Sequence, residues 1–312
     1  MLQNILIGIG AGLAAALLFG SPIGGTFLAM PLFALTGLPI AIAGLGWTPI
    51  AGIVAAIVGG AAVFIFLSPL AAGIFLLIFG LPLVWLTRLA GLSRQEGSDL
   101  EWYPLGRILA HAAIAVLLGL AAVGYLIGFD PEPMAAGMVE ALTAWLAERP
   151  DIEPRPSMAE LEPFIRFNVA ILPYTVAAIM TMIIVVDLWL AEIVTRASGR
   201  LARPRQRLCM VSVSTGVALA FPFVLAASFL PFPLGNIAAL ATGALGFVLM
   251  LVGLAVLHAI TLGHSARTAI LTFTYVVLVV LGFPILLFIA LGLVETLLYL
   301  RQRRFGGAPP TI

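Results

Sequence analysis

The sequence predicts an all-α fold, a polytopic transmembrane helical bundle of about 8–10 spans with short broken helices and one amphipathic extramembrane helix. Three observations carry this prediction: 62% of the 312 residues are hydrophobic, only 9% are charged, and the mean hydropathy is +1.18. A water-soluble core of this size would need more charged surface, and a membrane β-barrel would show alternating polarity instead of long apolar runs. We therefore expect residues 1–312 to form a single integral membrane domain, multi-pass in the bacterial cytoplasmic (inner) membrane.

The first segment, residues 1–88, is expected to be a four-span block, because no charged side chain precedes Arg88. Its breaks are rich in Gly, Pro and Ser and fall at residues 21–25, 44–49 and 68–69. Pro31 and Pro39 interrupt the second span, so this piece is either a full crossing or a short broken or re-entrant helix. Small residues recur at every fourth position, which predicts close packing within the chain or docking of a partner helix.

The middle of the chain contains the longest polar segments. Residues 89–129 are expected to form a cytoplasmic loop followed by one span. Residues 130–163 contain eight acids against two arginines, a balance that suits an extracytoplasmic segment. Within it, apolar side chains recur at helical spacing at Met134, Met138, Leu142 and Trp145. This spacing predicts an amphipathic helix that lies on the membrane surface or caps the bundle.

Residues 164–312 are expected to contain the C-terminal spans, and their arginines predict the orientation of the chain. The first of these spans is followed by an arginine cluster without acids, comprising Arg196, Arg200, Arg203, Arg205 and Arg207. Such a cluster marks the cytoplasmic end of a span. The last apolar stretch, residues 268–300, would be about 50 Å long as one helix, too long for a single untilted crossing.

That last stretch ends in Arg301, Arg303 and Arg304. A single crossing would place these arginines outside, whereas a hairpin at residues 282–284 returns them to the cytoplasm. We therefore expect ten spans, with nine as the alternative, and cytoplasmic N- and C-termini.

The candidate site is a set of polar side chains that this topology brings to the cytoplasmic face: Asp187, His258, His264, Arg267 and Glu295. Asp187 lies about two turns inside the membrane, where an unpaired carboxylate costs several kcal/mol, so we expect Arg267 or a histidine as its partner. The cluster is then either a set of structural ion pairs or a ligand or partner site. Glu192 is left out because it precedes Arg196 by four residues and is expected to form a helical ion pair. The two histidines are six residues apart, which is not the spacing of a helical zinc pair, so no metal site is expected.

Two short stretches resemble a known family. They are Gly253-Leu254-Ala255-Val256-Leu257-His258 and Gly292-Leu293-Val294-Glu295 followed by Arg301, and they accompany the charge-free, glycine-rich N-terminal block. Together they resemble the YybS-like family of uncharacterised bacterial membrane proteins. That family is distantly similar to the substrate-binding S-components of energy-coupling-factor transporters. The resemblance implies a membrane bundle that binds a small molecule and works with a separate energising subunit.

Two classes of function follow. The first is binding or transport of a small solute within the lipid bilayer, and the second is a non-catalytic scaffold or assembly factor for partner proteins. An enzyme is not expected, because no complete nucleophile and base set is visible, and no cofactor is expected either. The chain contains no lysine, which excludes a phosphate-binding Walker lysine and a Schiff base. No nucleic acid is expected as a partner.

Overall fold

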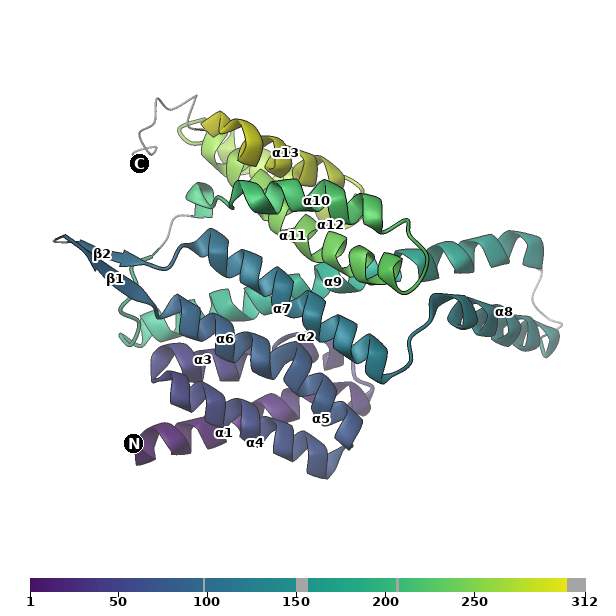
Figure 1. Ribbon diagram of the computed structural model, residues 1–312, viewed down its shortest axis with the longest axis horizontal. Coiled ribbons are helices and arrows are strands. Elements are labelled where there is room, and N and C mark those ends of the chain that lie inside the picture. Colours follow the sequence, from purple (N-terminus) through teal and green to yellow (C-terminus); the bar gives the residue numbers. More distant parts are fainter. Residues whose placement is uncertain (98, 150–156, 206–207, 302–312) are drawn as a thin grey trace.

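The computed structural model describes residues 1–97, 99–149, 157–205 and 208–301, and it is a helical bundle with one small β-hairpin (Figure 1). The predicted all-α membrane bundle is confirmed. Seven helical segments of the described residues are long and apolar enough to cross a membrane. Three shorter apolar helices of 13, 15 and 14 residues accompany them near the C-terminus.

The N-terminal half of the bundle is built from short, closely connected helices. These are α1 (Leu2–Phe19), α2 (Ala29–Ala34), α3 (Leu38–Gly46), α4 (Pro49–Phe66), α5 (Pro69–Phe75) and α6 (Leu81–Ala90), with a π-helical turn, Leu76–Gly80, between the last two. The predicted breaks are confirmed. Thr48 and Ser68 cap α4 and α5 by accepting hydrogen bonds from backbone N–H groups, and each is followed by a proline in the first turn.

The second span is broken, as one of the predicted alternatives proposed. Helices α2 and α3 are separated by the turn at residues 35–37, and Pro39 lies in the first turn of α3. The span is not re-entrant, because α3 ends beside Trp47, whose ring lies 4.5 Å from the Arg200 guanidinium after the end of the long helix α9 (Met158–Ala197). Helices α2 and α3 together therefore carry the chain back to the end of the bundle where it began (Figure 1).

Glycines bring α1 and α4 into close contact. A Cβ added to Gly12 would lie 2.5 Å from the carbonyl oxygen of Ala55, and one added to Gly8 would lie 2.7 Å from Cβ of Val54. These positions therefore admit no side chain without movement of the helices. The small-residue faces predicted from the sequence are used for packing within the chain.

A short antiparallel β-hairpin, β1 (Ser93–Glu96) with β2 (Asp99–Trp102), precedes α7 (Leu105–Leu126). The hairpin lies in the polar part of residues 89–129, for which only a loop before the span was predicted. Arg94 lies opposite Glu101 in the register, and its Nε donates to the Glu101 carboxylate at 2.7 Å. The hairpin projects from the same end of the bundle as the N-terminus (Figure 1).

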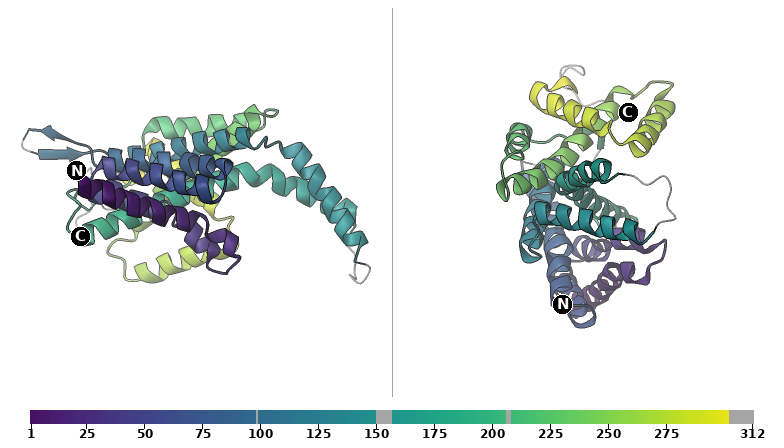
Figure 2. Two further views of the ribbon diagram at one scale, coloured as in Figure 1. Left: turned by 90° about the horizontal axis from the view of Figure 1, so that it is seen from below. Right: turned by 90° about the vertical axis from the view of Figure 1, so that its right-hand side faces the viewer.

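The predicted amphipathic segment is α8 (Pro131–Ala147), and it packs antiparallel to the first turns of α9. Ala135 of α8 is buried with Ile165 and Val169 of α9. The two helices extend together beyond the bundle at the end opposite the N-terminus, as Figure 1 and the left view of Figure 2 show. Only the first turn of α8 lies near the turn between α10 and α11, and the rest follows the projecting part of α9, so α8 does not cap the bundle along most of its length.

The C-terminal half consists of a 3₁₀ turn (Leu208–Met210), α10 (Thr215–Ala227), α11 (Leu234–Ile260), α12 (Arg267–Leu281) and α13 (Ile285–Leu298). Helix α11 is its centre, since 78% of its most apolar 18-residue stretch is buried. The predicted hairpin at residues 282–284 is confirmed, with Gly282 at φ +69° between α12 and α13. Because of this hairpin, α13 ends at the same end of the bundle as α9 and the N-terminus (Figure 1).

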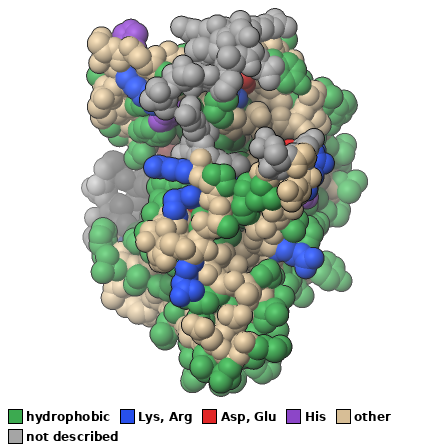
Figure 3. All heavy atoms as spheres, turned by 90° about the vertical axis from the view of Figure 1, so that its left-hand side faces the viewer, with side chains coloured by type: hydrophobic (Ala, Val, Ile, Leu, Met, Phe, Trp, Pro, Cys, Tyr) green, Lys and Arg blue, Asp and Glu red, His purple; other side chains and the backbone are tan. Residues whose placement is uncertain are grey.

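Charge is divided between the two ends of the bundle. Most described arginines lie at the end that contains the N-terminus and the β-hairpin, and Figure 3 shows several of them on that face. Acids dominate the opposite end, on α8 and the first turns of α9: Asp130, Glu132, Glu140, Glu148, Glu160 and Glu162. This segregation fits the orientation expected from the sequence. Arg207, Arg303 and Arg304, which contributed to that expectation, lie outside the described residues.

Candidate ligand-binding cavity

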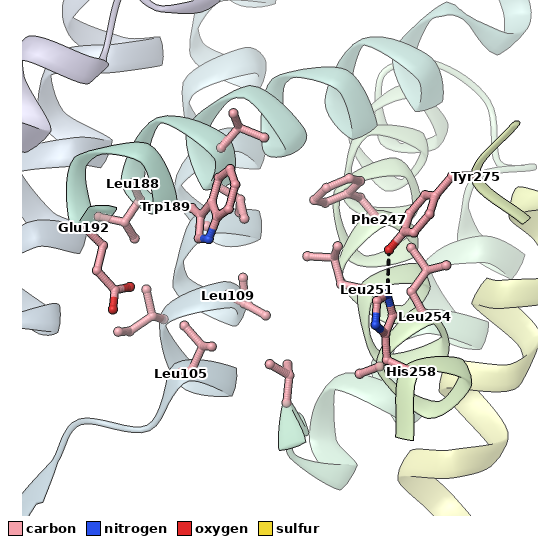
Figure 4. Close-up of a pocket in the computed structure, with 16 residues that line it drawn as sticks. Leu105, Leu109, Leu188, Trp189, Glu192, Phe247, Leu251, Leu254, His258 and Tyr275 are labelled. Atoms are coloured by element: carbon pink, nitrogen blue, oxygen red, sulfur yellow. Dashed lines mark hydrogen bonds between the residues drawn. The ribbon is translucent and has the colours of Figure 1, made fainter. Parts of the chain in front are cut away.

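A cavity of about 330 Å³ lies between α7, α9, α11 and α12 (Figure 4). Its wall is almost wholly apolar. The larger side chains come from α7 (Leu105, Ile108, Leu109), α9 (Val185, Leu188, Trp189) and α11 (Phe247, Leu251, Leu254). A volume of this order lies at the lower end of the range of about 300–1,000 Å³ that is typical of small-molecule sites.

Polar groups enter this cavity on two sides. Tyr275 of α12 and His258 of α11 form a hydrogen bond of 2.8 Å between the tyrosine hydroxyl and the histidine Nε2. Glu192 of α9 lies on the opposite side, with apolar side chains between it and the histidine (Figure 4). Its carboxylate also accepts from Arg196 at 2.6 Å, which confirms the predicted helical ion pair. Glu192 and His258 are both close to the ends of their helices at the arginine-rich face, so the polar side of the cavity is near that face.

Helix α9 packs against both the N-terminal half of the bundle and α11. Ile184 and Ala191 belong to the core shared with the N-terminal half, Ala177 belongs to the core around α11, and Val185 packs against both. Gly243 of α11 lets the two helices approach closely, because an added Cβ would lie 2.1 Å from the carbonyl oxygen of Tyr174.

Helix α12 is the loosely attached wall. None of its residues is buried, and its link to α11 is the hydrogen bond between Tyr275 and His258. It is flanked by Gly263 at φ +76° and Gly282 at φ +69°, backbone conformations that suit glycine. The helix therefore covers one side of the cavity without being part of the packed core.

Asp187 does not line the cavity, and the predicted pairing with Arg267 or a histidine is wrong. Its side chain is fully buried, and Oδ2 accepts from the backbone N–H of Gly37 at 3.0 Å. Among the described residues, Oδ1 has no hydrogen-bond partner. The two side chains do not meet because they lie on different sides of α9. Asp187 is on the face of α9 that packs against α3 and α6, whereas His258 belongs to α11, which packs against another face.

The remaining predicted residues are also separated. His264 accepts from the N–H of Ala266 at 3.1 Å within its own turn, and Arg267 begins α12. Glu295 is 5% exposed and pairs with Arg301, whose Nε donates to it at 2.7 Å. Of the five predicted site residues, the structure places His258 alone in the cavity wall.

The Arg301 side chain has further partners. It donates to the carbonyl oxygens of Cys209 and, at 2.7 Å, Val211. The pair of Glu295 and Arg301 therefore fastens the end of α13 to the segment that precedes α10. For Glu295, this arrangement matches the first of the two predicted alternatives, a structural ion pair, and not a ligand or partner site.

Part of the arginine cluster also has a structural role. Arg203 is 4% exposed, and its guanidinium donates to the carbonyl oxygens of Ala90 at 3.1 Å and Tyr103 at 2.8 Å. Burial lowers the pKa of this guanidinium, and the Glu192 carboxylate partly offsets the effect; an arginine nevertheless stays charged. Arg196 in turn donates to the carbonyl oxygen of Arg203 at 2.9 Å. These contacts hold the base of the β-hairpin against the end of α9.

Sequence reasoning missed Trp189 and Tyr275. A tryptophan near the end of a span reads as an interfacial anchor, and a single tyrosine in an apolar stretch carries no site signal. Within the part of the chain that the structure describes, no group of three His, Cys, Asp or Glu side chains is arranged to hold a metal ion. Comparison with family models, with curated proteins and with solved structures gives no significant match, so the resemblance to the YybS-like family stays a prediction.

Proposed function

We propose that this multi-pass membrane protein binds a small amphiphilic molecule in the cavity between α7, α9, α11 and α12, as a step in its transport or its handling within the membrane. The observation that carries the proposal is that the cavity wall has a large apolar part and a few polar groups. Phe247, Leu251 and Leu254 offer an apolar surface, while Glu192 and the pair of His258 with Tyr275 offer hydrogen-bonding groups near the arginine-rich face. An apolar pocket with a few convergent polar groups is the usual form of a small-molecule site.

The polarity of the site indicates how the ligand is oriented. An apolar portion of the ligand would lie among the leucines and Phe247, and a neutral or cationic polar group would reach Glu192 or His258. The polar group would then lie close to a membrane face and the apolar portion towards the bilayer centre, which is the orientation of a membrane-dissolved amphiphile. Access from the lipid phase past α12 is consistent with the loose attachment of that helix.

The alternative, a scaffold or assembly factor, has less support. Its two expected docking surfaces were the glycine faces and the arginine loop. Gly8 and Gly12 are used for contact with α4, and Arg196, Arg200 and Arg203 have partners within the chain. If the protein transports its ligand, we propose that a separate energising subunit drives the transport, as the family resemblance implies.

Native mass spectrometry of the protein released from gentle detergent tests this proposal. Leu251→Trp adds a bulky ring to the cavity wall and should abolish the mass of a co-purifying small molecule that wild type retains. Leu219→Trp is the matched control, because Leu219 is 51% exposed on α10 and does not line the cavity. Equal retention by all three proteins, or no bound molecule in wild type, would contradict the proposal.

A further inference from the structure

A second chemical site lies at the break between α2 and α3. The fully buried carboxyl of Asp187 receives one hydrogen bond there, from the N–H of Gly37, the residue that precedes α3. Its other oxygen, Oδ1, is buried and has no partner among the described residues. A side chain this deep in a membrane bundle is normally paired, so the unpartnered oxygen needs a chemical explanation.

The surrounding half of the bundle offers no countercharge. Residues 2–87 contain no Asp, Glu, Lys, Arg, His, Cys or Tyr, so α3 and most of α6 have no ionisable side chain. Arg88, in the last turn of α6, is five residues beyond Leu83, the α6 side chain nearest to the break. On α9 itself, Glu192 is already paired with Arg196.

The other elements that pack against α9 have ionisable side chains that are directed elsewhere. His111 of α7 lies 3.1 Å from the hydroxyl of Tyr103, and His258 of α11 is bonded to Tyr275. Arg107 lies in the first turn of α7, at the arginine-rich face. No described residue thus forms an ion pair with Asp187.

The space around the carboxyl is also too small for a hydrated metal cation. A Cβ added to Gly37 would lie 2.6 Å from Oδ2 of Asp187 and 2.1 Å from Cδ1 of Leu83, so the Oδ2 side is filled. Oδ1 is itself buried and has almost no surface that a water molecule could reach. A sodium ion would need several oxygen ligands, whereas a proton needs one oxygen and no additional volume. The tight fit therefore favours a proton.

We propose that Asp187 is a proton-binding site, protonated in this packing and able to release its proton only when the break between α2 and α3 opens. An ionised carboxylate here would be desolvated without a countercharge, and a single N–H donor does not offset that cost. Broken helices that meet an intramembrane carboxyl are sites where membrane proteins bind coupling ions. Because Asp187 does not line the cavity, the inference stands independently of the proposed amphiphile.

Infrared spectroscopy of the purified protein at neutral pH tests the proposal. A protonated carboxyl has a carbonyl stretching band that ionised carboxylates lack. We expect this band in wild type and in Glu192→Gln, which removes an ion-paired carboxylate five residues away, and we expect its loss in Asp187→Asn. The asparagine variant should also melt within a few degrees of wild type, because its amide oxygen can still accept from Gly37.

A second measurement covers the case in which Asp187→Asn fails to fold. Wild type labelled with ¹³C at the aspartate side-chain carboxyl should show the band at lower frequency, since the other three aspartates, at positions 99, 130 and 151, lie in polar segments of the sequence outside the apolar spans. A band that is unaffected by the label, or no band at all, would overturn the proposal. So would a melting temperature of wild type, but not of Asp187→Asn, that rises with sodium and not with potassium.

Discussion

The contact between α11 and α13 gives a sharp test of the terminal hairpin. At Gly292 of α13, an added Cβ would lie 1.9 Å from the carbonyl oxygen of Leu249 and 3.0 Å from the backbone nitrogen of Gly253. Ordinary contact begins near 3.4 Å, so Gly292→Ala forces the two backbones apart by about 1.5 Å. Backbone atoms cannot rotate away as side chains do, which places the cost at the upper end of the range for overpacking, about 3 kcal/mol.

The assay is thermal unfolding in detergent at one fixed heating rate, since membrane proteins often unfold irreversibly. With an unfolding entropy of about 2.1 cal/mol/K per residue over 312 residues, a loss of about 3 kcal/mol lowers the melting temperature by about 5 °C. Gly10→Ala is the matched control, because an added Cβ at Gly10 has no atom within 4 Å, and its melting temperature should stay close to that of wild type. A Gly292→Ala protein that melts with wild type would refute the close packing of α13 on α11.

Three further predictions concern the arginine-rich end. Arg203→Ala should destabilise the protein by about 2–4 kcal/mol, because one buried and one partly buried carbonyl group lose their donor, whereas Arg205→Ala at an exposed position should change thermal stability little. Glu295→Gln should cost about 3 kcal/mol in the same assay, because it leaves the Arg301 guanidinium without its carboxylate at an almost buried position; an unchanged melting temperature would show that the pair is dispensable. Reporter fusions at both termini should be active only on the cytoplasmic side, and a C-terminal fusion active outside would contradict the hairpin of α12 and α13.

The predictable parts of this fold depend on length, hydropathy and turn residues. The hairpin at residues 282–284 follows from an apolar stretch too long for one crossing and from the arginines after it. The breaks before α4 and α5 follow from Thr48-Pro49 and Ser68-Pro69, which combine a capping side chain with a proline suited to the first turn. Such signals are local, and each can be recognised without knowing the neighbouring helix.

The candidate site depends on the rotation of each helix about its axis, which is not a local property. Asp187 and Val185 are two residues apart on α9, yet the first faces the N-terminal half and the second lines the cavity. Which face meets which neighbour is decided by close backbone approaches, such as that of Gly243 to Tyr174. The prediction that Asp187 lies beside His258 used only their depth in the membrane. The two residues are at similar depth but on different helix faces, so the predicted cluster does not form.

The measurement that tests the central claim most directly is photocrosslinking from inside the cavity in intact membranes. Phe247 is 8% exposed and lines the cavity, whereas Phe223 is 73% exposed on α10, so each can be replaced in turn by the photoreactive amino acid p-benzoylphenylalanine. A specific occupant predicts that position 247 captures one small amphiphile of defined mass, while position 223 captures the mixture of bulk lipids. Capture of the same lipid mixture at both positions, or no adduct at position 247, would contradict a dedicated ligand site between α7, α9, α11 and α12.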